Sequence, residues 1–127
     1  MEQPLPDPRA RKFRQAAFVY LLVGILYTGA VWAMAGAGIL PADRGPVQLW
    51  IVFGAAIVAF VFWALWSWQN AWVARVVFVL HALRVPALIE NAWFPSPDAA
   101  IPPSFYMTAL VVVVANLWML ARAGWDL

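Results

Sequence analysis

Four long apolar runs, separated by short polar or proline-bearing segments, dominate the chain. The first covers Ala16 to Leu40, and three more cover about 47–67, 71–91 and 104–121. Each run is close to the roughly 20 apolar residues that a helix needs to cross a bilayer. No run alternates polar and apolar residues over the length of a barrel strand, so helices remain the way to satisfy the backbone in lipid. The pattern predicts an all-α integral membrane protein, with four transmembrane helices arranged as two antiparallel hairpins with short loops.

The polar segments set the boundaries of this architecture. We expect residues 1–15 to form a polar, Pro/Arg-rich cytoplasmic leader, because prolines at alternate positions oppose a helix. Residues 16–127 then make one membrane domain. The interruption at 67–70 is too short for a linker and predicts a tight antiparallel pairing of the second and third helices. Pro86 is expected to bend the third helix, and Ser104 to cap the fourth.

Composition excludes a water-soluble domain. The chain is 65% hydrophobic and 11% charged, whereas soluble domains carry about 25% charged residues. Cysteine is absent, which rules out disulfides, thiolate metal sites and cysteine nucleophiles. The net charge of +2 comes with basic residues placed beside the first apolar run, where they set orientation. We therefore expect no nucleic-acid partner.

The distribution of Lys and Arg predicts the topology. With the N-terminus inside, the outer side receives only Arg44 and the inner side receives six basic residues: Arg9, Arg11, Lys12, Arg14, Arg75 and Arg122. Both termini should therefore be cytoplasmic. We expect a bacterial inner or intracytoplasmic membrane. Tryptophan favours the boundary between lipid and water, and six of the nine are predicted to form boundary belts: Trp50, Trp66, Trp68, Trp72, Trp93 and Trp125. Three lie deeper and should pack on neighbours or on a partner: Trp32, Trp63 and Trp118.

Four polar residues within or near the spans form a candidate intramembrane cluster: His81, Arg84, Glu90 and Asn116. Arg84 lies about 18 Å from the start of its helix at 1.5 Å per residue, and an intramembrane charge is costly enough to indicate function. It could snorkel to the boundary, pair with Glu90, or meet an acidic residue or lipid phosphate from outside the chain. His81 is expected to hydrogen-bond Asn116, with ligation of a tetrapyrrole metal as the alternative. No cofactor and no metal site are predicted.

Small residues at helical spacing predict close helix packing in the first two spans. They are Gly29, Ala33 and Ala37 in the first helix, and Ala55 and Ala59 in the second.

No motif in the chain specifies a catalytic reaction. It contains no HExxH, no Walker loop, no paired carboxylates and no Ser/His/Asp set. We expect a non-catalytic accessory or structural subunit of a larger membrane complex, such as a respiratory or photosynthetic assembly. Its partners would be other integral membrane subunits, membrane lipids, and pigments held by those subunits. The alternative is a small oligomeric channel or transporter that uses the His81 and Arg84 face. An enzyme ranks third, with His81, Arg84 and Glu90 as its polar centre.

Overall fold

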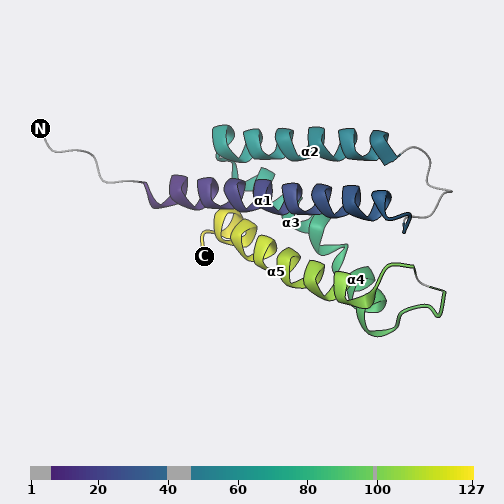
Figure 1. Ribbon diagram of the computed structural model, residues 1–127. Helices are drawn as coiled ribbons and strands as arrows, with labels where there is room; N and C mark the ends of the chain where they lie inside the picture. Colours follow the sequence, from purple (N-terminus) through teal and green to yellow (C-terminus); the bar gives the residue numbers. More distant parts are fainter. Residues whose placement is uncertain (1–6, 40–46, 99) are drawn as a thin grey trace, which may run out of the picture.

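The computed structural model describes residues 7–39, 47–98 and 100–127, and this part of the chain is helical, without strands. The helices are α1 (Pro8–Gly36), α2 (Val47–Trp68), α3 (Ala71–Ala82), α4 (Val85–Trp93) and α5 (Pro103–Trp125), as Figure 1 shows. α3 and α4 together make one stretch, so four segments are long and apolar enough to cross a membrane. The predicted class, an all-α membrane protein with four spanning segments, is confirmed.

Helix α1 begins at Pro8, eight residues before the expected start. Residues 8–15 are therefore helical, and the expectation of a non-helical leader is wrong for this part; residues 1–6 lie outside the described residues. Proline is tolerated in the first turn, where its missing N–H has no acceptor in the helix. The Asp7 carboxylate caps the helix by accepting the Arg9 backbone N–H at 3.0 Å.

The third span is broken just before Pro86. α3 ends at Ala82, and α4 begins at Val85. Because Pro86 has no N–H, the carbonyl four residues earlier, that of Ala82, lacks its usual donor. The third span was expected as one helix bent at Pro86, and the structure divides it into two helices at that point. At the start of α5 the cap residue is Pro102, and Ser104 lies inside the helix, so its expected role as cap is wrong.

Helix packing gives two pairs. α1 packs against α2, and α3 and α4 pack against α5, while α1 also contacts α5 (Figure 1). This arrangement is compatible with two antiparallel hairpins. α2 and α3 make far fewer contacts with each other than these helix pairs do, although only a short turn joins them. In that turn Gln69 takes a left-handed conformation (φ 48°), and Asn70 caps α3 by accepting the Trp72 N–H at 2.8 Å. The predicted tight pairing of these two helices is therefore not the main packing.

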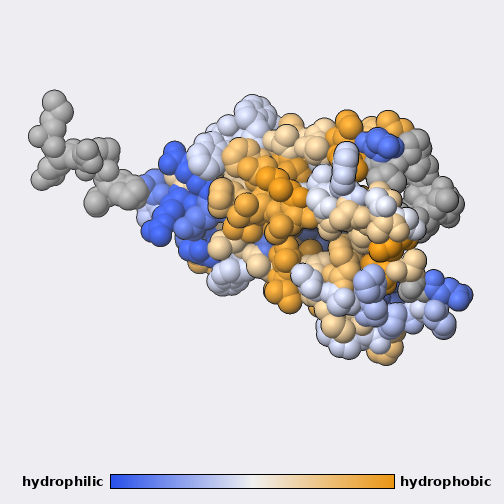
Figure 2. All heavy atoms as spheres, viewed as in Figure 1, coloured by the Kyte–Doolittle hydropathy of each residue, from blue (hydrophilic) through white to orange (hydrophobic). Residues whose placement is uncertain are grey.

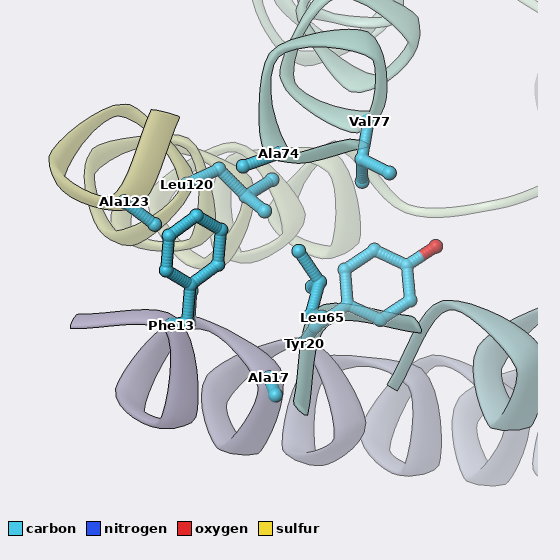
Figure 3. Close-up of a cluster of buried hydrophobic side chains, with 9 residues drawn as sticks. Phe13, Ala17, Tyr20, Leu65, Ala74, Val77, Leu120 and Ala123 are labelled. Atoms are coloured by element: carbon cyan, nitrogen blue, oxygen red, sulfur yellow. The ribbon is translucent and has the colours of Figure 1, made fainter. Parts of the chain in front are cut away.

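The buried core lies at one end of the bundle. The start of α1, the end of α2, the start of α3 and the end of α5 converge there (Figure 3). Its members are Phe13, Ala16, Ala17, Tyr20, Leu65, Ala74, Val77, Leu120 and Ala123. Toward the other end α5 diverges from α1 in Figure 1, and Ala92 is the buried hydrophobic residue found there in the described chain. The bundle is thus closed at one end and open at the other.

One glycine sets the spacing of α1 and α2. A Cβ built on Gly24 would lie 2.6 Å from both γ carbons of Val58. Gly29, the glycine expected to do this, has nothing within 4 Å of such a Cβ. The four alanines predicted to pack with it are exposed: Ala33, Ala37, Ala55 and Ala59. The expected small-residue contact is therefore wrong, because residue spacing defines a stripe on a helix but not which stripe faces a neighbour.

Candidate functional site

His81 is held by a tyrosine of the first helix. Its Nε2 lies 3.0 Å from the Tyr20 hydroxyl, and the two rings meet edge to face with centroids 5.2 Å apart. The predicted hydrogen bond to Asn116 is wrong, because α1 brings Tyr20 to the same level of the bundle. The sequence contained a signal for this pair. A tyrosine within an apolar span needs a polar partner for its hydroxyl, and His81 is the imidazole of the chain.

Asn116 is a separate buried polar group on α5. It is 1% exposed, and its Oδ1 has no hydrogen-bond partner among the residues that the structure describes. It lies one turn before Leu120, on the helix face that carries the core. Its burial removes it from any surface through which a ligand could enter.

Arg84 is exposed at the break between α3 and α4. Its guanidinium carbon lies 5.7 Å from the centroid of the Tyr27 ring. In the described part of the chain it has no carboxylate or carbonyl acceptor, and Glu90, six positions on, forms no ion pair with it. Arg84 thus makes a cation–π contact within the chain and has a guanidinium edge available to an outside group.

These contacts form a polar seam between α1 and the third span, made by Tyr20, Tyr27, His81 and Arg84. Tyr20 and Tyr27 are two turns apart on one face of α1, and His81 and Arg84 are three positions apart, so the two pairs lie in line. The seam contains two phenol hydroxyls, an imidazole and a guanidinium but no carboxylate. Across residues 7–39, 47–98 and 100–127, no group of three or more His, Cys, Asp or Glu comes together. The seam therefore offers hydrogen-bond and cation positions without an acid partner.

Six of the described basic residues lie at the closed end of the bundle, and several of them join helix ends. Lys12 Nζ lies 2.7 Å from Asp126 Oδ1, which places the start of α1 beside the end of α5. The hydrogen bond from Lys12 holds the pKa of the Asp126 carboxyl below its ordinary value. Arg9 donates to the Gln69 carbonyl at 3.1 Å. These contacts link three helix termini across the polar surface.

Arg75 binds the last turn of α5. Its Nε donates to the Gly124 carbonyl at 2.8 Å, and its guanidinium lies over the rings of Trp72 (5.1 Å) and Trp125 (5.5 Å). A terminal helix carbonyl has no partner inside its own helix, and Arg75 supplies one. A Cβ on Gly124 would lie 3.0 Å from Arg75 Cγ, so the glycine admits this close approach.

Two other arginines, Arg11 and Arg14, line a groove of about 580 Å³ between the start of α1 and the end of α2. The Arg14 guanidinium carbon lies 5.5 Å from the centroid of the Trp66 ring. Neither arginine has an ion-pair partner in the described chain. The sequence identified both residues as orientation signals only. It could not show the groove, which depends on α1 beginning early enough to place them opposite Trp66.

The tryptophans fall into three groups, one at each end of the bundle and one between the ends. Four lie at the basic end, near the α2–α3 turn or the end of α5: Trp66, Trp68, Trp72 and Trp125. Two lie at the opposite end, at the start of α2 and the end of α4: Trp50 and Trp93. The three deeper rings are at least half exposed on the chain surface, Trp32 at 66%, Trp63 at 50% and Trp118 at 57%. They therefore face outward rather than into the core.

Comparison with known proteins identified no relative of this chain. No family model matches the chain, and neither the curated proteins nor the solved structures gave a match.

Proposed function

We propose that the protein is a non-catalytic accessory subunit that packs against other integral membrane subunits of a larger complex. The observation that carries the proposal is the exposure of Arg84 within the third span. Arg84 lies about 20 Å from Ala71 and about 13 Å from Trp93 at 1.5 Å per residue. A charge at such depth costs about 2.5–3.5 kcal/mol on insertion scales unless a partner satisfies it. An acidic or carbonyl group of a neighbouring subunit would supply that partner.

The outward aromatic rings support the same proposal. Trp32, Trp63 and Trp118 lie on three different spans. Trp63 also meets Trp68 edge to face, at 5.1 Å between ring centroids, in an exposed aromatic cluster on α2. Large flat rings provide contact area at low entropic cost, which is why they are frequent in interfaces. Partner helices, with lipids or bound pigments between them, would cover these faces.

The experiment that tests the proposal is co-purification from native membranes in mild detergent, comparing the parent with Arg84→Leu. We expect the parent to retain partner subunits and the variant to lose most of them, because the leucine keeps the apolar volume but removes the cation. Leu83→Ala is the matched control, since Leu83 is 70% exposed beside Arg84. It should retain the partners.

Two outcomes would contradict this function. In the first, Arg84→Leu keeps the same partners in the same amounts as the parent. In the second, the protein purifies without other subunits as a homo-oligomer that conducts ions or moves a solute in liposomes. The second result would favour a channel or transporter built on the His81 and Arg84 face.

The proposed orientation places both termini in the cytoplasm of a bacterial cell. It rests on the basic end, where the first helix begins and the last one ends. The chain has no cysteine, so single cysteines at Leu127 and Asp98 can be labelled without background. We expect a membrane-impermeant reagent to label them from opposite sides, with Leu127→Cys reactive only from the cytoplasm. Labelling of both from one side would contradict four spans.

A further inference from the structure

We propose that the groove between the start of α1 and the end of α2 binds the phosphate of an anionic glycerophospholipid through Arg11 and Arg14. This lipid site is independent of the proposed subunit role. It rests on the shape of the groove, on the charges left unpaired in it, and on its position where polar surface meets apolar surface.

The groove has the chemistry of a phosphate site. Arg11, Arg14 and Phe18 follow one another at intervals of three and four residues, so they share one face of α1. The Trp66 ring opposite lies 5.5 Å from the Arg14 guanidinium, and this contact orients the arginine. Gln15, also in the lining, accepts from Arg122 at 3.3 Å, which fixes that wall. Two guanidinium groups on one wall match the bidentate hydrogen bonding of a phosphate.

The other basic side chains of this end are engaged with the protein itself. Lys12 binds Asp126, and Arg9 and Arg75 donate to backbone carbonyls. Arg11 and Arg14 form no ion pair in the described part of the chain. The one acid in the groove lining, Asp7, uses its side chain to accept the N–H of Arg9. The groove therefore presents two cations and a single occupied carboxylate, which favours an anion.

The position of the groove favours a lipid over a soluble phosphate. Figure 2 shows a hydrophilic surface over the start of α1 that gives way to apolar side chains farther along the bundle. Phe18 lies one turn beyond Arg14 in the direction of the span and is 55% exposed. Trp66 lies at the end of its span, where tryptophan marks the headgroup level. A phosphate at the arginines would therefore let an acyl chain descend along Phe18, and basic pockets between spanning helices are known to take anionic headgroups.

The test is lipid binding to the purified full-length chain, measured by native mass spectrometry. Phosphatidylglycerol, phosphatidylcholine and soluble glycerol phosphate are titrated separately. We expect tightest binding of phosphatidylglycerol. Arg11→Gln or Arg14→Gln alone should lower the affinity for this lipid by about fivefold. The double variant should lower it by about twenty- to thirtyfold. Asp7→Asn should raise the affinity, because asparagine caps the helix equally well while the negative charge is removed.

The control removes the same number of positive charges from the same end, outside the groove. Arg9→Gln with Lys12→Gln should leave the preference for phosphatidylglycerol within about twofold of the parent, since neither residue lines the groove. An equal loss in this control would mean general attraction to a basic surface and would overturn the site. Unchanged binding by the Arg11→Gln, Arg14→Gln variant, or no gain in Asp7→Asn, would also overturn it. Binding of glycerol phosphate as tight as that of the lipid would show a site for free phosphate instead.

Discussion

Substituting Gly24 tests how closely α1 and α2 approach. A Cβ at this position would lie 2.6 Å from Cγ1 and Cγ2 of Val58 and 3.1 Å from its Cβ. Favourable contacts between carbon atoms occur at about 3.5–4.0 Å. Because valine is branched at Cβ, its side chain has little freedom to turn away. Gly24→Ala therefore has to push the two helices apart.

The expected cost follows from that overlap. Forcing an extra carbon into a packed contact costs about 1–3 kcal/mol. In water an alanine would recover about 1 kcal/mol through helix propensity, but separated helices in a bilayer stay helical, so this gain is largely absent. Val58→Ala removes both γ carbons that the new Cβ would meet. The pair should therefore be coupled by about 1–2 kcal/mol, with the double variant more stable than the two single losses predict.

The measurement is unfolding of purified protein by SDS in mixed micelles, followed by tryptophan fluorescence. Gly29→Ala is the matched control on the same helix, because nothing lies within 4 Å of its added Cβ. It should change stability by less than about 0.5 kcal/mol. The reasoning is refuted if Gly24→Ala and Gly29→Ala unfold at the same SDS fraction. It is also refuted if the double variant loses as much stability as Gly24→Ala and Val58→Ala lose separately.

Two further predictions concern single polar contacts. The Lys12 hydrogen bond lowers the folded-state pKa of Asp126 below its ordinary 3.8, so this pair stabilises the fold fully above about pH 5 and loses its contribution as the pH falls through the lower folded value. Asp126→Asn should therefore reduce stability at neutral pH and flatten its decline in acid, measured by unfolding across pH; identical acid profiles would contradict the pair. Tyr20→Phe and His81→Ala should each destabilise the protein, with a coupling of about 0.6 kcal/mol and at most about 1.7 kcal/mol in a double-mutant cycle. Purely additive losses would exclude the hydrogen bond.

The fold was predictable because hydrophobicity alone determines which segments cross a bilayer. The four apolar runs gave the spans, and Pro86 gave the interruption in the third one. The number of prolines in residues 1–15 predicts the wrong start for α1. Pro8 stands at the first position of the helix, where proline is favourable, and Asp7 before it is a good cap. Position relative to the helix end, and not composition, decides the effect of such a residue.

The candidate site was less predictable, because it depends on which helix faces lie opposite each other. His81 and Arg84 were identified from their cost in lipid, but their contacts, Tyr20 and Tyr27, belong to a different helix. Position along the expected helices favours Asn116 as the partner of His81, whereas the structure brings Tyr20 to it. Which of these two side chains faces His81 depends on how α1 and α5 are rotated about their axes. Apolar residues are spread evenly around each helix, so the sequence does not specify this rotation.

The two ends of the bundle differ for a physical reason, and this difference separates the two proposals. Lipid tails are as apolar as leucine, so helices in a bilayer are held together by close packing and polar contacts rather than by the hydrophobic effect. At the basic end such contacts are present, in the Lys12–Asp126 pair and in the Arg75 bond to Gly124. Toward the other end the helix pairs diverge, and there Arg84 is exposed. A partner subunit would supply the missing contacts at the open end, whereas a lipid phosphate would bind at the closed end. Arg84→Leu should therefore release partners without altering lipid selectivity, and loss of both groove arginines should do the reverse. If either change affected both readouts equally, a single site would have to account for both.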